Sequence, residues 1–545
     1  MNVKILLFLL VLSSANLYSQ PSEEWVKRYN GSGNSFDIVS DLILGSNNDI
    51  FVFGSSSGAG SLYDFTIIKY DRDGNTKWIQ YYNGKGNSTD QINSACLDLH
   101  NNSYVTGFTT DLSFISSLTT AKYDSSGNLI WMKEFRNSLF SNGYGVDIAV
   151  DQSGNILVCG AVRHITSGKY STVILKYSSD GNLSGSLIYD STGISETVPV
   201  KIKTGANGDI AVAGSSIIPP GRKDMNVTLI KVFPEIASSV NINGSSNEED
   251  EITDIITDKA GNIYICGNMR NTLSSSDFYY AKLDTSGEIV WQGNYNGIGN
   301  NIDIPYAITL DETGNIYLTG YSKSSTAAGS EDVLTVKISP SGNLMWSRLY
   351  DGAGNGTDQG ITIAAGTEGS VYVGGGTDRE SNDMVYLLIK YDSEGNLQWT
   401  EDYYVSDISE DFIYEVKLDL KNNIYVTGIS SGINSAYDFA TIKYSQTTDI
   451  IRTSNNIPDD FYLNQNFPNP FNPSTNLEFG ISRSGFVSLK VYDLLGNEVI
   501  TLVNEIKTPG IYNVKFDGIS LPSGIYFYAL RSGSFNEAKS MIILK

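Results

Sequence analysis

Six aspartates recur at matching positions of a repeated loop, and carboxylates are the residues of this chain with the most chemistry to offer. They are Asp37, Asp90, Asp250, Asp303, Asp358 and Asp411, while Gly143 and Thr197 fill the same position in the two other copies. Carboxylates gathered in a ring could collect a cation such as calcium, or act as acid and base on a glycan. The alternative, which we favour, is that each carboxylate accepts hydrogen bonds from the amides of its own loop. We therefore predict no cofactor and keep calcium as the ion that these six candidate metal ligands could bind.

Other residue types that support catalysis are scarce. The histidines and cysteines are His100, His164, Cys96, Cys159 and Cys266. A metal site built on several histidines, a Ser-His-Asp triad and a disulfide framework all lack material. The acidic run from Glu248 to Glu251 lies in the least regular part of the chain, where an enzyme would depart from the repeat. Catalytic residues stay unassigned.

The loops belong to a repeat that covers most of the chain. A segment of the form apolar-Gly-Asn-apolar-aromatic-Val-x-Gly ends at glycines separated by 53, 53, 54, 53, 53, 55 and 53 residues. These glycines are Gly54, Gly107, Gly160, Gly214, Gly267, Gly320, Gly375 and Gly428. Period-two alternation predicts four strands in each copy, joined by Asp-x-x-Gly-Asn turns such as Asp71 to Asn75. A period of roughly 50 residues is typical of propeller blades.

Tryptophan marks the fourth strand of most copies. The tryptophans are Trp25, Trp78, Trp131, Trp291, Trp346 and Trp399, with Gly185 in the same position of the third copy and no recognisable pattern near Ser238. We expect these indoles to pack between adjacent blades. Trp25 lies 53 residues before Trp78 and supplies the copy that is missing at the end of the repeat. The chain therefore starts with the outer strand of the blade that it finishes near Tyr444, which predicts eight blades.

The repeats resemble bacterial β-propeller repeats of the SBBP type over residues 22–445. We expect an all-β fold in which residues 20–445 form an eight-bladed β-propeller closed by an N-terminal strand. A linker at 446–461 and a small Ig-like β-sandwich at 462–545 should follow it. At the N-terminus, Lys4 precedes an apolar run from Ile5 to Leu12, which is too short to span a bilayer. Residues 1–19 are predicted to be a signal peptide, and no later segment is predicted to cross a membrane.

Residues 462–545 follow a different pattern. The run Asn466-Phe-Pro-Asn-Pro-Phe-Asn-Pro473 precedes alternating segments that predict a β-sandwich. Together with Val491-Tyr-Asp-Leu-Leu-Gly-Asn-Glu-Val499 and Ser523-Gly-Ile-Tyr-Phe-Tyr528, it closely resembles the type A C-terminal sorting domain of the type IX secretion system of Bacteroidota. The resemblance implies contact with that machinery, export through the periplasm and across the outer membrane, and removal of the domain. The product would be released or attached to surface lipopolysaccharide. An Ig-like binding module is the alternative.

Net charge narrows the partners. The formal charge of −23 disfavours nucleic acid and anionic membranes. We expect a secreted or cell-surface propeller that acts as a binding or scaffold module for a glycan or protein and is not an enzyme. The alternative is a carbohydrate-active hydrolase or lyase with its site at the mouth of the propeller channel. A quinone-dependent dehydrogenase is a third class, because the tryptophan element resembles the docking motif of eight-bladed quinoproteins, but adjacent cysteines are absent.

Overall fold

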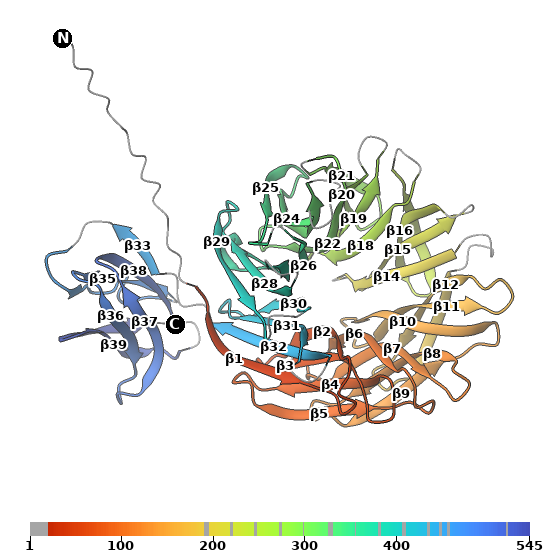
Figure 1. Cartoon of the computed structure of the whole chain (residues 1–545), viewed down its shortest axis with the longest axis horizontal. Coiled ribbons are helices and arrows are strands. Elements are labelled where there is room, and N and C mark those ends of the chain that lie inside the picture. The colour runs from red at the N-terminus through yellow and green to blue at the C-terminus, as the bar shows by residue number, and fades with distance from the viewer. Residues whose placement is uncertain are drawn as a thin grey trace, which may run out of the picture. The chain divides into compact units, whose positions relative to one another are not determined.

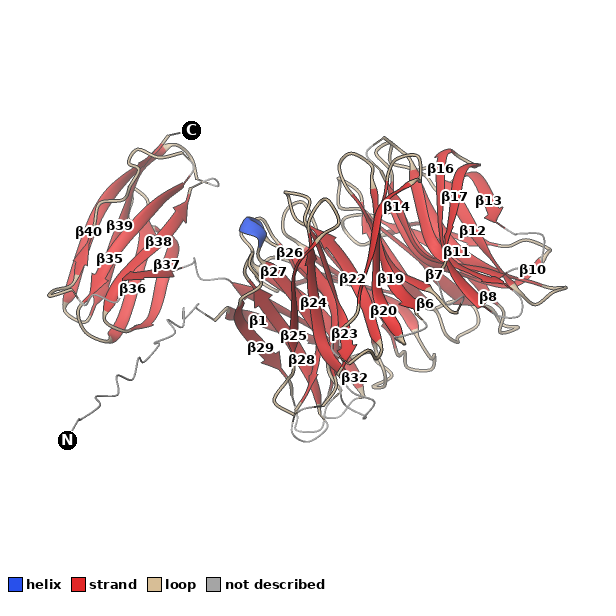
Figure 2. Cartoon of the chain, turned by 90° about the horizontal axis from the view of Figure 1, so that it is seen from above, coloured by secondary structure: helices blue, strands red, loops and turns tan. Residues whose placement is uncertain are grey.

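The fold is all-β, as the sequence predicts. The computed structural model of the chain describes residues 20–189, 196–205, 207–218, 222–244, 248–271, 275–297, 299–324, 331–354, 356–379, 383–405, 410–432, 436–445, 450–454, 458–472, 474–518 and 521–544. The expected signal peptide at 1–19 lies outside the described residues, as do 446–449 and 455–457 of the expected linker. Every regular element in the described residues is a strand except η1 (Thr367–Gly369), a short 3-10 turn (Figure 2). The chain divides into two compact units, one spanning Glu23–Tyr444 and the other containing Ser445–Lys545.

The described part of residues 22–445 forms eight four-stranded sheets, which we number in chain order. Sheets 1 and 2 contain β2 (Ile38–Leu44), β3 (Ile50–Ser56), β4 (Asp64–Tyr70), β5 (Thr76–Tyr82), β6 (Gln91–Leu97), β7 (Ser103–Thr110), β8 (Ser116–Tyr123) and β9 (Leu129–Phe135). Sheets 3 and 4 contain β10 (Phe140–Val150), β11 (Ile156–His164), β12 (Tyr170–Tyr177), β13 (Leu183–Tyr189), β14 (Glu196–Thr204), β15 (Ile210–Ile218), β16 (Arg222–Val232) and β17 (Glu235–Ile242). Sheets 5 and 6 contain β18 (Glu251–Thr257), β19 (Ile263–Arg270), β20 (Ser276–Leu283), β21 (Ile289–Tyr295), β22 (Asp303–Leu310), β23 (Ile316–Lys323), β24 (Glu331–Ile338) and β25 (Leu344–Tyr350). Sheets 7 and 8 contain β26 (Asp358–Ala365), β27 (Val371–Asp378), β28 (Met384–Tyr391), β29 (Leu397–Tyr403), β30 (Phe412–Leu418), β31 (Ile424–Ser431), β32 (Tyr437–Ser445) and β1 (Ser22–Tyr29).

These sheets follow one another around a ring. The first strand of each sheet contacts the first strands of the sheets on either side, and β2 contacts β30. The first strands lie nearest the middle of the ring, and fourth strands such as β5, β9 and β25 lie at its rim (Figure 1). In sheet 1 every residue of β3 and β4 is buried, because neighbouring sheets cover both of their faces. Strands buried on both faces are continuous apolar runs, and the whole arrangement fits a β-propeller.

The N-terminal strand completes the last sheet. β1 lies beside β32, so sheet 8 combines the first strand of the chain with three strands from the end of the repeat. Arg28 of β1 donates hydrogen bonds to the Ser430 hydroxyl at 2.6 Å and the Ser430 carbonyl at 2.9 Å. Its guanidinium also lies 3.0 Å from the Asp438 carboxylate. Pairing of residues about 400 positions apart in the sequence therefore joins the two ends of the ring.

Tryptophans fill the space between a fourth strand and the next sheet. The Trp78 Nε1–H donates to the Ser125 carbonyl in a turn of sheet 2 at 3.3 Å. A Cβ on Gly127 of that turn would lie 2.9 Å from the indole, and Gly127 has a φ of +89°, so both space and backbone require glycine. The same donation joins Trp25 to Arg72, Trp131 to Ser179, Trp291 to Pro340 and Trp346 to Ser393. Trp399 is 3% exposed and packs against Tyr372.

The second unit contains two further sheets around one core. Their orders are β33-β38-β35-β34 and β37-β36-β39-β40. The strands are β33 (Ile450–Ser454), β34 (Tyr462–Leu463), β35 (Ser474–Ile481), β36 (Gly485–Tyr492), β37 (Glu498–Lys507), β38 (Gly510–Asp517), β39 (Gly524–Ser532) and β40 (Phe535–Ile543). Phe479 from the first sheet and Leu489 from the second belong to the same buried cluster. Tyr528 fixes the proline-rich entry: its hydroxyl accepts from Asn466 N–H and donates to the Asn464 carbonyl, both at 2.8 Å.

Candidate functional site

The six recurring aspartates are buried at the starts of first strands. They are between 0% and 1% exposed. Their carboxylates accept backbone N–H groups: Gly31 donates to Asp37, Gly84 to Asp90, Gly244 to Asp250, Gly297 to Asp303, Gly352 to Asp358, and Ser431 to Asp411. Burial raises the pKa of Asp37 and of Asp303 to about 6. Hydrogen bonds from backbone amides are what we expect if these aspartates stabilise the loops rather than bind an ion.

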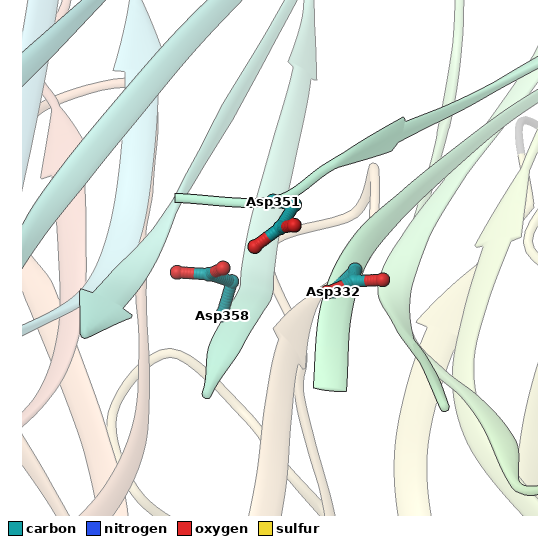
Figure 3. A group of neighbouring side chains, drawn as sticks. All are labelled: Asp332, Asp351 and Asp358. Atoms are coloured by element: carbon teal, nitrogen blue, oxygen red, sulfur yellow. The ribbon is translucent and has the colours of Figure 1, made fainter. Parts of the chain in front are cut away.

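The structure does not gather these six carboxylates in one place. Each lies at a different junction between neighbouring sheets. Among the described residues, one group of three carboxylates has oxygens within 4.8 Å of one another, and of the six it includes Asp358 alone, with Asp332 and Asp351 (Figure 3). A shared ring site therefore has no support from this geometry.

The acidic run from Glu248 to Glu251 does not form one cluster, since Asp250 is buried and Glu251 begins β18. Glu248 and Glu249 are exposed, and Glu248 lies 3.7 Å from Arg270. Glu251 forms an ion pair with Lys223. The cysteines are free, and Cys159 and Cys266 are buried. Neither set offers a convergent group of reactive side chains.

A charged cluster that the sequence reasoning missed lies in the middle of the ring. Each first strand carries a β-bulge, and the residue after the bulge occupies an equivalent position in all eight sheets. These residues are Asp41, Ser94, Asp147, Lys201, Asp254, Ala307, Thr362 and Glu415. Bulges re-aim side chains and are common beside functional sites. We call the charged members, with Lys203 and Lys417 two residues further on, the central cluster.

Electrostatic coupling shows that the cluster converges from several sheets. Lys201 of β14 lies 3.4 Å from Asp254 of β18, Lys203 lies 3.8 Å from Asp147 of β10, and Lys417 lies 2.8 Å from Glu415. Asp254 is the main cause that raises the pKa of Lys201, and carboxylates of sheets 1, 3 and 8 add to it. Because these sheets stand around the ring, their side chains meet at its middle.

The carboxylates of the cluster differ in their pKa values. Burial, reinforced by Glu415, raises the pKa of Asp41 to about 7. Asp147 is equally enclosed, but Lys203 and Lys201 hold its pKa below the usual value. Asp147 also accepts hydrogen bonds from the Ser94 hydroxyl at 2.6 Å and the Ile202 N–H at 2.8 Å. The surroundings thus favour the protonated form of Asp41 and the ionised form of Asp147.

Solvent reaches the lysines more than the acids. The side chains of Lys201, Lys203 and Lys417 are 39%, 35% and 40% exposed. Their partners Asp254, Asp147 and Glu415 are 13%, 8% and 22% exposed. The lysine side chains are therefore the part of the cluster that solvent reaches most, in a chain of net charge −23.

The sequence contains one signal from which the central cluster could have been predicted. Each of these residues lies 13 positions before the repeated glycine of the second strand, and the position holds four acids and a lysine among the small residues Ser94, Ala307 and Thr362. A structural position of a repeat keeps one residue type, so this scatter of charge marks a departure from the repeat.

Comparison with known proteins agrees with the fold. Residues 465–544 match the family model of the secretion system C-terminal sorting domain, and residues 295–325 match that of a beta-propeller repeat. No curated protein matches the chain. A fungal alcohol oxidase of the AA5 family, in complex with copper, is 12% identical with a TM-score of 0.38, covering 97% of this chain and 99% of the other. The β-propeller domain of the Trilobed protease from Pyrococcus furiosus is 9% identical with a TM-score of 0.33, covering 63% and 91%.

A protein of unknown function from Dyadobacter fermentans is 10% identical with a TM-score of 0.35, covering 77% of this chain and 99% of the other. Likeness at this level says nothing about activity. In the described part of the chain, no helix is long and apolar enough to cross a membrane. The chain carries a beta-propeller repeat of the SBBP type and a type IX secretion C-terminal sorting domain, which directs it to secretion or to the cell surface.

Proposed function

We propose that the protein is an eight-bladed β-propeller, exported by the type IX secretion system, that binds its ligand at the central cluster. Eight sheets in a closed ring and the sorting domain support this. In this proposal residues 1–19 are a signal peptide, 20–445 the propeller, 446–461 a linker, and 462–545 an Ig-like sandwich that is removed after transit. The propeller then acts in the medium or at the outer surface, where lipopolysaccharide would hold it.

The observation that carries the binding role is the break in the repeat at the central cluster. Other repeat positions vary less, because six of the eight copies hold tryptophan at one position and aspartate at another. Packing does not require Lys201, Lys203 and Lys417 to be charged, because each is more than a third exposed. Retaining charge in an enclosed site costs desolvation free energy, and binding a polar partner is a reason to retain it.

The chemistry of the ligand follows from which side chains of the central cluster are accessible to solvent. The three lysine side chains are the more exposed part of the cluster, while Asp147 and Asp254 accept backbone N–H groups of the next first strand. An anionic group on an otherwise polar ligand fits this arrangement. A glycan that bears uronic acids combines these features and is compatible with an extracellular protein.

A binding titration tests this proposal. The purified chain is titrated calorimetrically with neutral oligosaccharides and with oligosaccharides that bear uronic acids. We expect saturable binding of the acidic set, weakened about tenfold or more in Lys201→Gln and in Lys417→Gln, since each removes one charged hydrogen bond. Lys85→Gln removes an exposed lysine outside the cluster and should bind like the unaltered chain. Equal affinity in all three variants would move the binding site away from the central cluster.

A carbohydrate-active enzyme is the second candidate, and one observation favours it. The surroundings of the two carboxylates shift their pKa values in opposite directions: the pKa of Asp41 is raised to about 7, and that of Asp147 is lowered. That is the pattern of a general acid and a base. The same oligosaccharides, assayed for new reducing ends, decide between the candidates: Asp41→Asn should abolish any turnover while binding persists. If the unaltered chain forms no new reducing ends, the enzyme candidate is excluded and the binding module is the remaining candidate.

A further inference from the structure

Two aspartates lie side by side at five junctions between neighbouring sheets. We call one the loop aspartate, at the start of a first strand, and the other the third-strand aspartate, at the start of the third strand of the preceding sheet. The pairs are Asp64 with Asp90, Asp224 with Asp250, Asp277 with Asp303, Asp332 with Asp358, and Asp438 with Asp37. Backbone contacts fix them: Asp90 N–H donates to the Tyr63 carbonyl at 2.7 Å, and Ser276 forms a bridge with Ile302.

The two members of a pair are kept or lost together in seven of the eight junctions. Ser117 precedes Gly143, and Ser171 precedes Thr197, at the corresponding positions around sheet 3. Val385 with Asp411 is the exception. Buried carboxylates repel each other, and repulsion alone favours loss of either one. Joint retention indicates that the two act together.

Several oxygens of these pairs are buried without a hydrogen-bond partner. This holds for Oδ1 of Asp64, Asp277, Asp224 and Asp438, in residues that are 8%, 5%, 3% and 5% exposed. At the junction of sheets 5 and 6, a Cβ on Gly297 would lie 2.6 Å from Asp303 Oδ1 and 2.2 Å from the Ser322 hydroxyl oxygen. The Ser322 hydroxyl therefore lies next to Asp303 Oδ1 and is its hydrogen-bond partner, so the unpaired oxygen of this pair is Asp277 Oδ1. Unpaired buried carboxylate oxygens need a proton, a water or a cation.

Arginine compensates two of the five pairs. Arg28 lies 3.0 Å from Asp438, and Arg222 lies 2.8 Å from Asp224. Among the described residues, no ion pair reaches the aspartates at the junctions of sheets 1 and 2, 5 and 6, or 6 and 7. In the part of the chain that the structure describes, these three junctions therefore hold neighbouring carboxylates with no ion-paired cation.

The junction of sheets 6 and 7 adds a third carboxylate. Asp332 from β24, Asp351 from the loop after β25 and Asp358 from β26 have oxygens within 4.8 Å of one another (Figure 3). Asp351 stands where four other copies have asparagine, at Asn30, Asn83, Asn243 and Asn296. Oxygen donors at all of these positions match the preference of calcium, and no histidine or cysteine that would favour zinc is present in the group.

We propose that each of these three junctions binds a divalent cation of the calcium class between the loop aspartate and the third-strand aspartate. A bound cation offsets the repulsion between the paired carboxylates. It would also join one sheet to the next, as the indoles do at the rim.

Calcium titration of the purified chain tests the proposal. After chelation, calorimetry with calcium chloride should show saturable binding of about three ions, and thermal stability should rise with calcium in parallel. Asp277→Asn and Asp351→Asn should each remove about one equivalent. Asp351 is exposed, so its variant keeps the test valid if Asp277→Asn fails to fold. Asp224→Asn, at a junction that Arg222 compensates, is the matched control and should leave the stoichiometry unchanged.

Two results would overturn the proposal. One is a melting temperature of the unaltered chain that is the same with calcium and with chelator, together with an equal stabilisation by Asp277→Asn in the two solutions. The paired aspartates would then share a proton rather than bind a cation. The other is calcium binding whose stoichiometry no variant changes, which would place the ions at exposed acids elsewhere.

Discussion

Replacing Trp346 by alanine should destabilise the propeller by about 4 kcal/mol. The indole is 9% exposed, lies 6.0 Å from the Tyr317 ring and 6.1 Å from the Tyr391 ring, and donates to the Ser393 carbonyl at 3.0 Å. A Cβ on Gly395 would be 2.7 Å from it, so the next sheet contacts the indole directly. Loss of a buried aromatic side chain costs about 3–5 kcal/mol, and the lost hydrogen bond is worth about 1 kcal/mol of that total.

Urea unfolding followed by tryptophan fluorescence measures this change. All six tryptophans lie in Glu23–Tyr444, so the signal reports that unit and not the C-terminal one. Trp346→Phe is the matched control: it keeps an aromatic ring, loses the N–H donor, and should cost about 1–2 kcal/mol. A loss below about 1 kcal/mol for Trp346→Ala, together with loss of ligand binding, would refute the packing role and make the indole a ligand contact.

Three further outcomes are expected. Deleting residues 21–30 removes β1 and bares the edge of β32, so the protein should aggregate in light scattering; unchanged melting and solubility would contradict closure by this strand. The pKa of Asp41 is raised from 3.8 to about 7, so ionising this carboxylate destabilises the folded protein increasingly as pH rises between these values. In urea titrations, Asp41→Asn should therefore stabilise the protein more at pH 8 than at pH 5. An equal gain at both pH values would refute the raised pKa. Truncation after Tyr444 should leave a folded propeller in the periplasm, while surface protein lacks residues 462–545 by mass spectrometry; a peptide ending at Lys545 on surface protein would contradict removal.

The sequence predicts the strands well because the signals that specify them are local. A turn such as Asp71 to Asn75 needs its aspartate and glycine within five residues: Asn75 N–H donates to Asp71 Oδ1 at 2.8 Å, and Gly74 has a φ of +81°. The fixed spacing of Gly54 and its equivalents then sets the register of whole sheets. The placement of β1 follows from counting strands, since a missing fourth strand and an extra N-terminal one must pair.

The candidate site is harder to predict because it depends on which strands meet in space. Asp41 and Lys201 lie in different sheets, and a bulge decides that the residue after it points to the middle of the ring. The aspartate pairs also join two sheets, although a constant spacing of 26 residues, as between Asp277 and Asp303, is a signal that the sequence contains. When each loop aspartate is considered only within its own loop, the third-strand aspartate that lies beside it is missed.

The ring departs most from its repeat in sheets 3 and 4, and this asymmetry is consistent with a binding role. Gly185 and Ser238 replace tryptophan there, and Phe233 fills the space beside Gly185, where a Cβ would lie 2.9 Å from its ring. β10 and β16 extend to 11 residues, against 7 or 8 in most other sheets, so longer pairing takes over from the indoles and aspartate pairs. The same two sheets supply Asp147, Lys201 and Lys203 to the central cluster. An eightfold array of identical blades presents identical chemistry around its axis, and a ligand of low symmetry can be oriented only where blades differ. Relaxing the repeat where longer strands compensate for the lost contacts is how this fold can acquire a directional site without opening its ring.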